Sequence, residues 1–145
     1  MRALPKRPLS SKRQLVPPLP TMHLELWVTH RKDRTRASRL LRKSYEVARR
    51  VTQEGGGDGP WLFLIDPDPS EPTTTRLRTT LRLRPDEDLW LELVFYPNQA
   101  RMRKIIRQIW KEPGFTVNAA ALDRLISRRR TGYQATLAYA TLASV

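Results

Sequence analysis

The sequence predicts an α+β domain in which short strands and amphipathic helices follow one another along most of the chain. Three observations carry this prediction. An alternating apolar pattern begins directly after Met22, as in a half-buried strand. A long segment with apolar residues at helical spacing then ends at the glycine-rich run 55–59. Finally, the apolar stretch 89–96 stops at Pro97 and passes directly into a second amphipathic helix.

The first half of the chain contains three of the expected elements. Residues 23–29 alternate between a face of aliphatic side chains and a face that carries Trp27, which predicts a strand. The helix that follows begins near Asp33 or Thr35, either of which can cap it, and it runs to the glycines. Residues 61–65 are a short and nearly continuous apolar run, which predicts a buried strand, and a proline-rich loop comes next.

The second half begins with a strictly alternating segment, residues 76–84, in which arginines occupy one face. Together with the apolar stretch 89–96 beyond the turn 85–88, this segment predicts an antiparallel hairpin. The remaining expected elements are the helix 98–110, a shorter helix 117–127 and a last strand 133–142. Arg128–Arg130 would then lie at the C-terminal end of the shorter helix, where the helix dipole favours cations.

The expected order is β-α-β-β-β-α-α-β. It contains the β-α-β-β-α-β unit of ferredoxin-like folds, with an added strand or extended hairpin and a small extra helix. Right-handed crossovers place both long helices on one face of an antiparallel sheet. The other face then has no cover from its own chain, so we expect it to pack on a second molecule or to bind a ligand.

Large aromatic rings are expected on that open face, opposite the aliphatic face of each strand. Such rings suit either an apolar cavity between two copies or a platform on which bases stack. The sequence lacks the aromatic signature of RNA-recognition motifs, which favours the cavity. The candidate ligand-binding residues are therefore Trp27, Trp90, Tyr96 and Tyr133.

The chain is strongly basic, with a formal net charge of +13 and a pI near 11.2. Such a surface attracts polyanions, so a nucleic-acid (RNA)-binding module or ribonucleoprotein subunit is the alternative function. The candidate nucleic-acid contacts are Arg76, Arg78, Arg82 and Arg84. On a strand all four would share one side, and arginine binds phosphate bidentately. The competing interpretation is a solvated edge strand whose charge prevents aggregation.

Several classes of site lack the residues they need. There is no cysteine, which excludes disulfides and thiolate sites and fits a reducing compartment, so we expect a cytoplasmic protein. His23 and His30 differ by seven positions and lie on opposite faces of one strand, so we expect no metal and no cofactor. No serine has a catalytic triad context. No apolar run approaches the roughly 18 residues of a membrane span, so no membrane partner is expected.

Residues 1–21 differ in composition from the rest of the chain. They hold basic residues and prolines but no acidic residue, which predicts a disordered arm ahead of a domain at 22–145. The arm is interpreted as a polyanion-binding tail, as a transit peptide, or as an over-long gene model whose true start is Met22. The prolines argue against a transit peptide, and the onset of the periodic pattern at Met22 favours the last interpretation.

Short motifs within residues 22–142 resemble the small dimeric α+β barrel proteins of the ferredoxin-like class, and most closely one bacterial family of uncharacterised function. These motifs are LLRKSYEV at 40–47, Pro85-Asp86-Glu87, the strand ending in Tyr96, Ala100-Arg101, Glu112-Pro113 and Gly132-Tyr133. The resemblance implies a homodimer that binds, or transforms, a small organic ligand in an apolar cavity. Catalytic residues differ between families of this class, so none is carried over. The chain departs from the pattern in its basic charge, its proline-rich loop and its arm.

Overall fold

The computed structural model describes residues 20–68, 70 and 76–137, with the side chains of 129–131 left out. The elements are β1 (Thr21–His30), a 3-10 turn (Arg31–Asp33), α1 (Arg34–Glu54), β2 (Asp58–Ile65), α2 (Leu77–Thr80), β3 (Glu87–Tyr96), α3 (Gln99–Trp110), α4 (Pro113–Asp123) and β4 (Ile126–Thr136). The expected arm lies outside the described residues except for Pro20 and Thr21, and Thr21 already belongs to β1.

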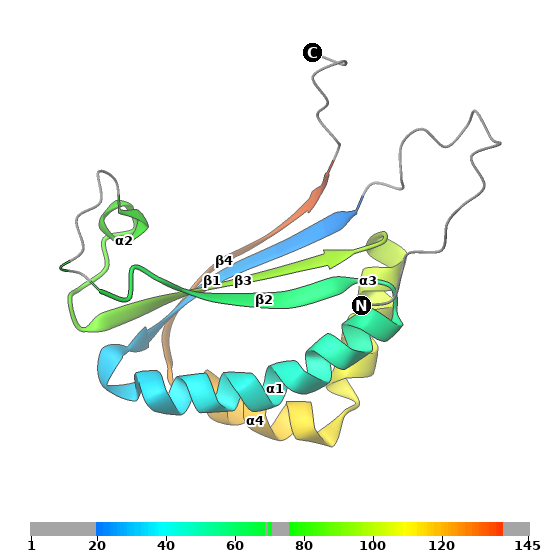
Figure 1. Cartoon of the computed structure of the whole chain (residues 1–145), viewed down its shortest axis with the longest axis horizontal. Coiled ribbons are helices and arrows are strands. Elements are labelled where there is room, and N and C mark those ends of the chain that lie inside the picture. The colour runs from blue at the N-terminus through cyan, green and yellow to red at the C-terminus, as the bar shows by residue number, and fades with distance from the viewer. Residues whose placement is uncertain (1–19, 69, 71–75, 138–145) are drawn as a thin grey trace, which may run out of the picture.

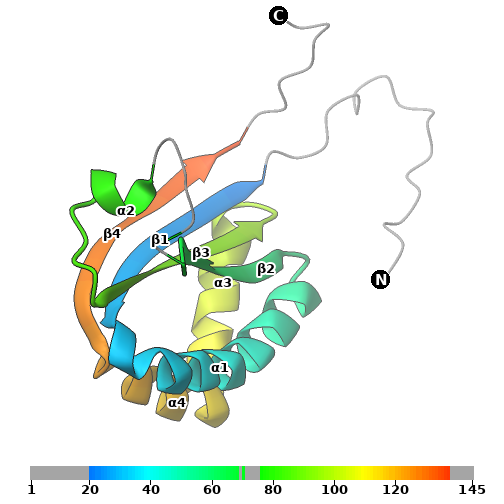
Figure 2. The same cartoon turned by 60° about the vertical axis from the view of Figure 1, so that its left-hand side comes forward.

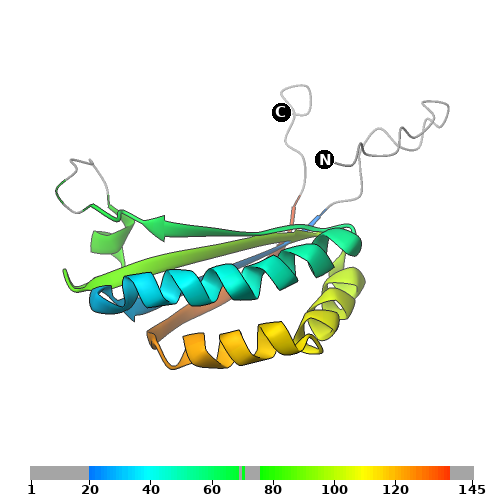
Figure 3. The same ribbon diagram turned by 60° about the horizontal axis from the view of Figure 1, so that its bottom comes forward.

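The four strands form one antiparallel sheet in the order β2-β3-β1-β4. Helices α1, α3 and α4 all lie on one side of this sheet, as Figures 1 and 3 show. The strand order and the helical layer confirm the predicted ferredoxin-like α+β fold. None of the helices in the described ranges combines the length and apolarity that crossing a bilayer requires.

The predicted strand at residues 76–84 is wrong. Leu77–Thr80 forms the short helix α2, and Arg82 has a positive φ of 54°. The physical reason lies in β3, which has β1 on one edge and β2 on the other, so that neither edge is left to pair with a hairpin strand. Helix α2 lies instead on the side of the sheet away from α1 and α4 (Figure 2).

The C-terminal elements begin earlier than predicted. Helix α4 begins at Pro113 rather than Val117, because proline fits the first turn of a helix, where its missing N–H is not needed. Strand β4 consequently begins at Ile126, which pairs with Thr29 of β1. Arg128–Arg130 therefore belong to a strand and not to a helix end. The last residues of the predicted strand 133–142 lie outside the described part of the chain.

The helices cover the face of the sheet that carries the tryptophans, which reverses the predicted sides. Trp27 and Trp90 are direct partners across β1 and β3, and their rings stack with centroids 5.4 Å apart. Both are buried with Ala37 and Leu41 of α1 and with Leu122 of α4. The alternation along β1 and β3 was predicted correctly, but which face meets the helices depends on packing. Large rings fill the space between a sheet and three helices.

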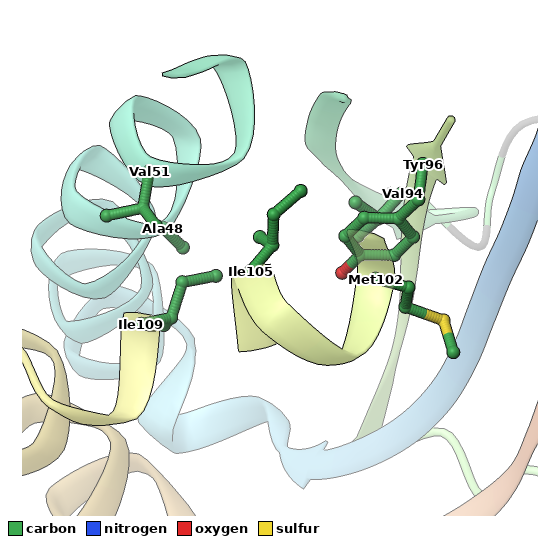
Figure 4. Packing of buried hydrophobic residues seen from close by; sticks show 7 residues of the cluster. All are labelled: Ala48, Val51, Val94, Tyr96, Met102, Ile105 and Ile109. Carbon is green, nitrogen blue, oxygen red and sulfur yellow. The ribbon is translucent and has the colours of Figure 1, made fainter. Parts of the chain in front are cut away.

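A second core cluster lies at the other end of this layer (Figure 4). Its members come from α1, β3 and α3, and they are Ala48, Val51, Val94, Tyr96, Met102, Ile105 and Ile109. The two clusters hold the helices at both ends of the sheet.

The start of β3 is held by buried carboxylates. Asp88 accepts two hydrogen bonds from the guanidinium of Arg34, at 2.8 and 2.7 Å, and Glu87 pairs with Arg128 of β4. Both acids were expected in an exposed turn at 85–88. They belong to β3 instead. Both carboxylates are buried, and the positive charge of the arginine beside each one offsets the free-energy cost of burying it.

Candidate ligand-binding site

A cavity of about 500 Å³ lies between the helix-covered face of the sheet and helices α1, α3 and α4. Its walls are mainly aromatic and aliphatic, with a smaller number of polar side chains from the sheet, from α1 and, as Thr116 and Asp123, from α4. Binding sites for small molecules commonly have this size and this mixture. The cavity lies within a single chain, between its own sheet and its own helices.

The sheet contributes alternate residues of its two central strands. Glu25 of β1 is the direct partner of Glu92 of β3, and His23 is the partner of Val94. Because successive side chains of a strand point to opposite faces, these residues share the face of Trp27. Two carboxylates thus stand opposite each other on one wall, an arrangement that by itself disfavours folding.

Hydrogen-bonding groups converge on these two carboxylates. The hydroxyl of Tyr45, from α1, donates a hydrogen bond to Oε2 of Glu92 at 2.5 Å. Nε2 of His23 lies 3.6 Å from Oε2 of Glu25. Contact with Glu25 raises the pKa of His23, burial opposes this effect, and the negative charge of Glu92 adds to it. The cluster of His23, Glu25, Tyr45 and Glu92 therefore favours a protonated imidazole.

Other polar groups at the cavity wall are buried. The side-chain oxygens of Ser44 and Thr52, both on α1, and Nδ1 of His23 have no hydrogen-bond partner within the described part of the chain. Burial, followed by the charge of Glu92, raises the pKa of the Tyr96 phenol, so this group stays protonated. Unpartnered buried polar atoms are rare in native proteins, so their concentration at this wall makes the wall a candidate binding surface.

The wall opposite the sheet is formed by α3 and α4. The rings of Trp110 and Phe115 meet edge to face with centroids 5.0 Å apart, and Ala119 and Ala120 continue the lining. Small side chains here leave the volume open.

The described ranges contain no group of three His, Cys, Asp or Glu residues placed to hold a metal ion. Among the side chains that line the cavity, His23 is one that can both donate and accept hydrogen bonds and can exchange a proton.

The four predicted ligand-binding residues do not stay together. Trp27 and Tyr96 line the cavity, whereas Trp90 stacks on Trp27 without lining it. Tyr133 lies on the opposite, uncovered face and is 55% exposed. Tyr133 shares the face of Leu24 and not that of Trp27, because Leu24 is its direct partner in β1.

Sequence reasoning missed the polar cluster. His23 and Glu25 share the face of Trp27, and the aliphatic residues between them point to the other face. Glu92 interrupts an otherwise apolar strand. A charged residue in the middle of each of two central strands was the available signal.

The predicted arginine ladder does not form. Nη2 of Arg78 donates to the carbonyl oxygen of Arg84 at 3.0 Å, and Nη1 of Arg76 donates to that of Asp68 at 3.4 Å. Arg82 lies in the turn after α2. Because these residues occupy a helix and turns, Arg76, Arg78, Arg82 and Arg84 do not share the side of a strand.

No family model and no curated protein matches the chain. Among solved structures, it is similar to a protein of Chloroflexus aurantiacus J-10-fl assigned as an antibiotic biosynthesis monooxygenase, with a TM-score of 0.50 and 10% identity over 84% of this chain and 96% of that one. SnoaB, a cofactor-independent oxygenase of Streptomyces nogalater, follows with a TM-score of 0.45 and 13% identity over 85% and 96% of the two chains. At such identities the likeness concerns the fold. The chain has a ferredoxin-like fold of the dimeric α+β barrel type.

Proposed function

We propose that this protein binds a small, largely apolar organic molecule in the cavity between its sheet and its helices. The observation that carries the proposal is the volume of about 500 Å³ lined mainly by aromatic and aliphatic side chains, with polar groups from β1, β3, α1 and α4 among them. Apolar walls supply affinity, and a small number of polar groups orients the ligand.

The polar cluster is the part of the cavity that gives the ligand its orientation. A protonated His23 donates hydrogen bonds, and Glu25 and Glu92 accept them, so a ligand with an oxygen or nitrogen atom at this end gains affinity. His23 is also the group able to pass a proton to a bound molecule, because its pKa is raised from an ordinary value of 6.5. Proton transfer is therefore the step this cavity would add to binding.

A neutral fluorophore tests the proposal. N-phenyl-1-naphthylamine is expected to bind saturably, with one molecule per chain and a rise in fluorescence. Ala119→Leu places three more carbon atoms in the cavity and is expected to weaken binding at least about tenfold. Ala121→Leu is the matched control, because Ala121 belongs to the same helix but does not line the cavity. Unsaturable binding, or equal effects of the two substitutions, would contradict the proposal.

We further propose that two copies pair through the uncovered face of the sheet. Support comes from an apolar row that is in register across all four strands and consists of Trp61, Leu93, Leu24 and Tyr133. At the β2 edge the guanidinium of Arg49, from α1, lies over the Trp61 ring, 5.3 Å from its centroid. Phe63, 45% exposed, is the direct partner of Leu91 in the next row. Apolar surface of this extent is usually covered in the working form of a protein.

The nucleic-acid alternative finds no support in the described part of the chain, since the strand that was to align its four arginines does not form. Part of the positive charge of the chain lies on α3.

A further inference from the structure

Helices α3 and α4 meet at a corner of the molecule (Figure 3). This corner combines apolar and cationic side chains. Trp110, the last residue of α3, is 56% exposed, and Val117 of α4 is 70% exposed. We call the surface formed by these two residues and the exposed cations near them the α3–α4 corner. Those cations are Arg103, Lys104 and Arg107 of α3 and Lys111, which directly follows it.

Helix α4 has a sparsely polar outer side for a surface helix. No charged residue occurs from Pro113 to Leu122, and its polar side chains are Thr116, Asn118 and the final Asp123, yet Leu122 is the one residue of α4 that is buried. Surface helices normally carry charged and polar residues along their solvent side. Within the described part of the chain, nothing covers the outer side of α4 at Val117.

Helix α3 places positive charge beside this apolar surface. Residues 97–111 contain no acidic side chain. Arg103, Arg107 and Trp110 lie at the spacing that brings helical residues to one face. The next acid, Glu112, lies 3.4 Å from Arg50 of α1. The corner therefore carries a local excess of positive charge next to exposed rings and methyl groups.

We propose that the α3–α4 corner docks on an anionic lipid surface. Trp110 and Val117 enter the boundary between headgroups and acyl chains, and the cations of α3 contact lipid phosphates. A second copy of this chain fits the corner poorly, because two sets of like charges would face each other. A nucleic acid would use the cations and leave Val117 and the apolar side of α4 exposed.

The corner is also a wall of the cavity, since Trp110, Phe115 and Ala120 line it. Docking would therefore bring the cavity next to the apolar phase. It does not depend on the proposed ligand, and it leaves the uncovered face of the sheet free, because α3 and α4 lie on the other side (Figure 1).

Flotation with lipid vesicles tests the proposal on the full chain. At 0.1 M salt we expect binding to vesicles of phosphatidylcholine and phosphatidylglycerol in a 7:3 ratio, and little binding to phosphatidylcholine alone. Replacing Arg103, Lys104 and Arg107 with glutamine is expected to lower the partition coefficient roughly 100-fold. The matched control removes the same charge from exposed positions of α1, through Arg36, Arg39 and Lys43→Gln, and is expected to have a much smaller effect.

A depth measurement separates insertion from simple charge attraction. In a Trp61→Phe background, Trp110 is the exposed tryptophan, because Trp27 and Trp90 are buried. Vesicles with brominated acyl chains are expected to quench its fluorescence, and Val117→Ser is expected to reduce the quenching. Equal losses in the α3 and α1 charge variants, unquenched Trp110, or binding to RNA in preference to vesicles would each overturn the proposal.

Discussion

His23 is the side chain through which pH acts on the cavity. Its pKa is raised above 6.5 mainly by Glu25, so the charged pair stabilises the fold fully below about pH 6.5 and loses this contribution as the pH rises through the folded-state pKa. Glu25→Gln is expected to lower the His23 pKa. An NMR titration of the His23 ring signal, identified by its loss in His23→Asn, measures the shift. The reverse direction would show that Glu25 does not hold the proton there.

Asp88 is the buried charge whose loss should be most costly. Its side chain is 1% exposed and accepts two hydrogen bonds from the guanidinium of Arg34. We expect Asp88→Asn to lower the free energy of unfolding by about 2–3 kcal/mol, because one buried charge-assisted contact is lost and Arg34 keeps its charge. Urea denaturation at pH 7 measures the difference.

The control for Asp88 is an exposed ion pair on α1. Arg50 and Glu54 lie 3.6 Å apart with both side chains more than half exposed. Glu54→Gln is therefore expected to change the free energy of unfolding by less than about 1 kcal/mol. If the two substitutions lower the free energy of unfolding equally, burial is not the reason for the contribution of the Arg34–Asp88 pair to stability.

At the scale of elements, the best predicted helices were those whose sequence shows an apolar stripe together with a capping residue or terminating glycines. Helix α3 begins after Asn98, whose Oδ1 accepts a hydrogen bond from the backbone N–H of Arg101 at 2.8 Å, and its apolar stripe repeats at helical spacing. Helix α1 likewise ends at the glycines. Segment 76–84 had an equally regular alternation, but alternation needs a free strand edge before it becomes a strand.

The turn between α1 and β2 depends on glycine at position 57. A Cβ atom there would lie 2.7 Å from the carbonyl oxygen of Phe95 and 2.8 Å from Cγ2 of Thr52. Gly57→Ala is expected to destabilise the protein by about 1–3 kcal/mol, because the backbone oxygen cannot move without disturbing β3. The measurement is again urea denaturation.

Gly114, in the first turn of α4, is the matched control. A Cβ atom at this position meets Cγ2 of Val47 at an ordinary 3.7 Å. Gly114→Ala is expected to be neutral or to stabilise by up to about 1 kcal/mol, since alanine favours the helix. Destabilisation there equal to that of Gly57→Ala would mean that the close approach is not the cause.

At the scale of the whole molecule, the uncovered face of the sheet should decide the oligomeric state. Leu93→Glu places a charge in the middle of the apolar row, and we expect it to convert a dimer into a monomer in sedimentation. Tyr133→Glu, at a more exposed site, repeats the test should Leu93→Glu fold poorly. Val117→Ser, on the helical side, is expected to leave the mass unchanged. A monomeric wild-type protein would refute the proposed pairing.

The sequence by itself determined the order of most elements, the ferredoxin-like class and the alternation along β1 and β3, because these follow from local periodicity, caps and turns. Tertiary structure alone decided three things. It decided which face of the sheet the helices cover, since both faces carry apolar residues. It decided that residues 76–84 stay out of the sheet, because both edges of β3 are occupied. It also brought Tyr45 of α1 onto Glu92 of β3, a contact across 47 residues that no local pattern encodes.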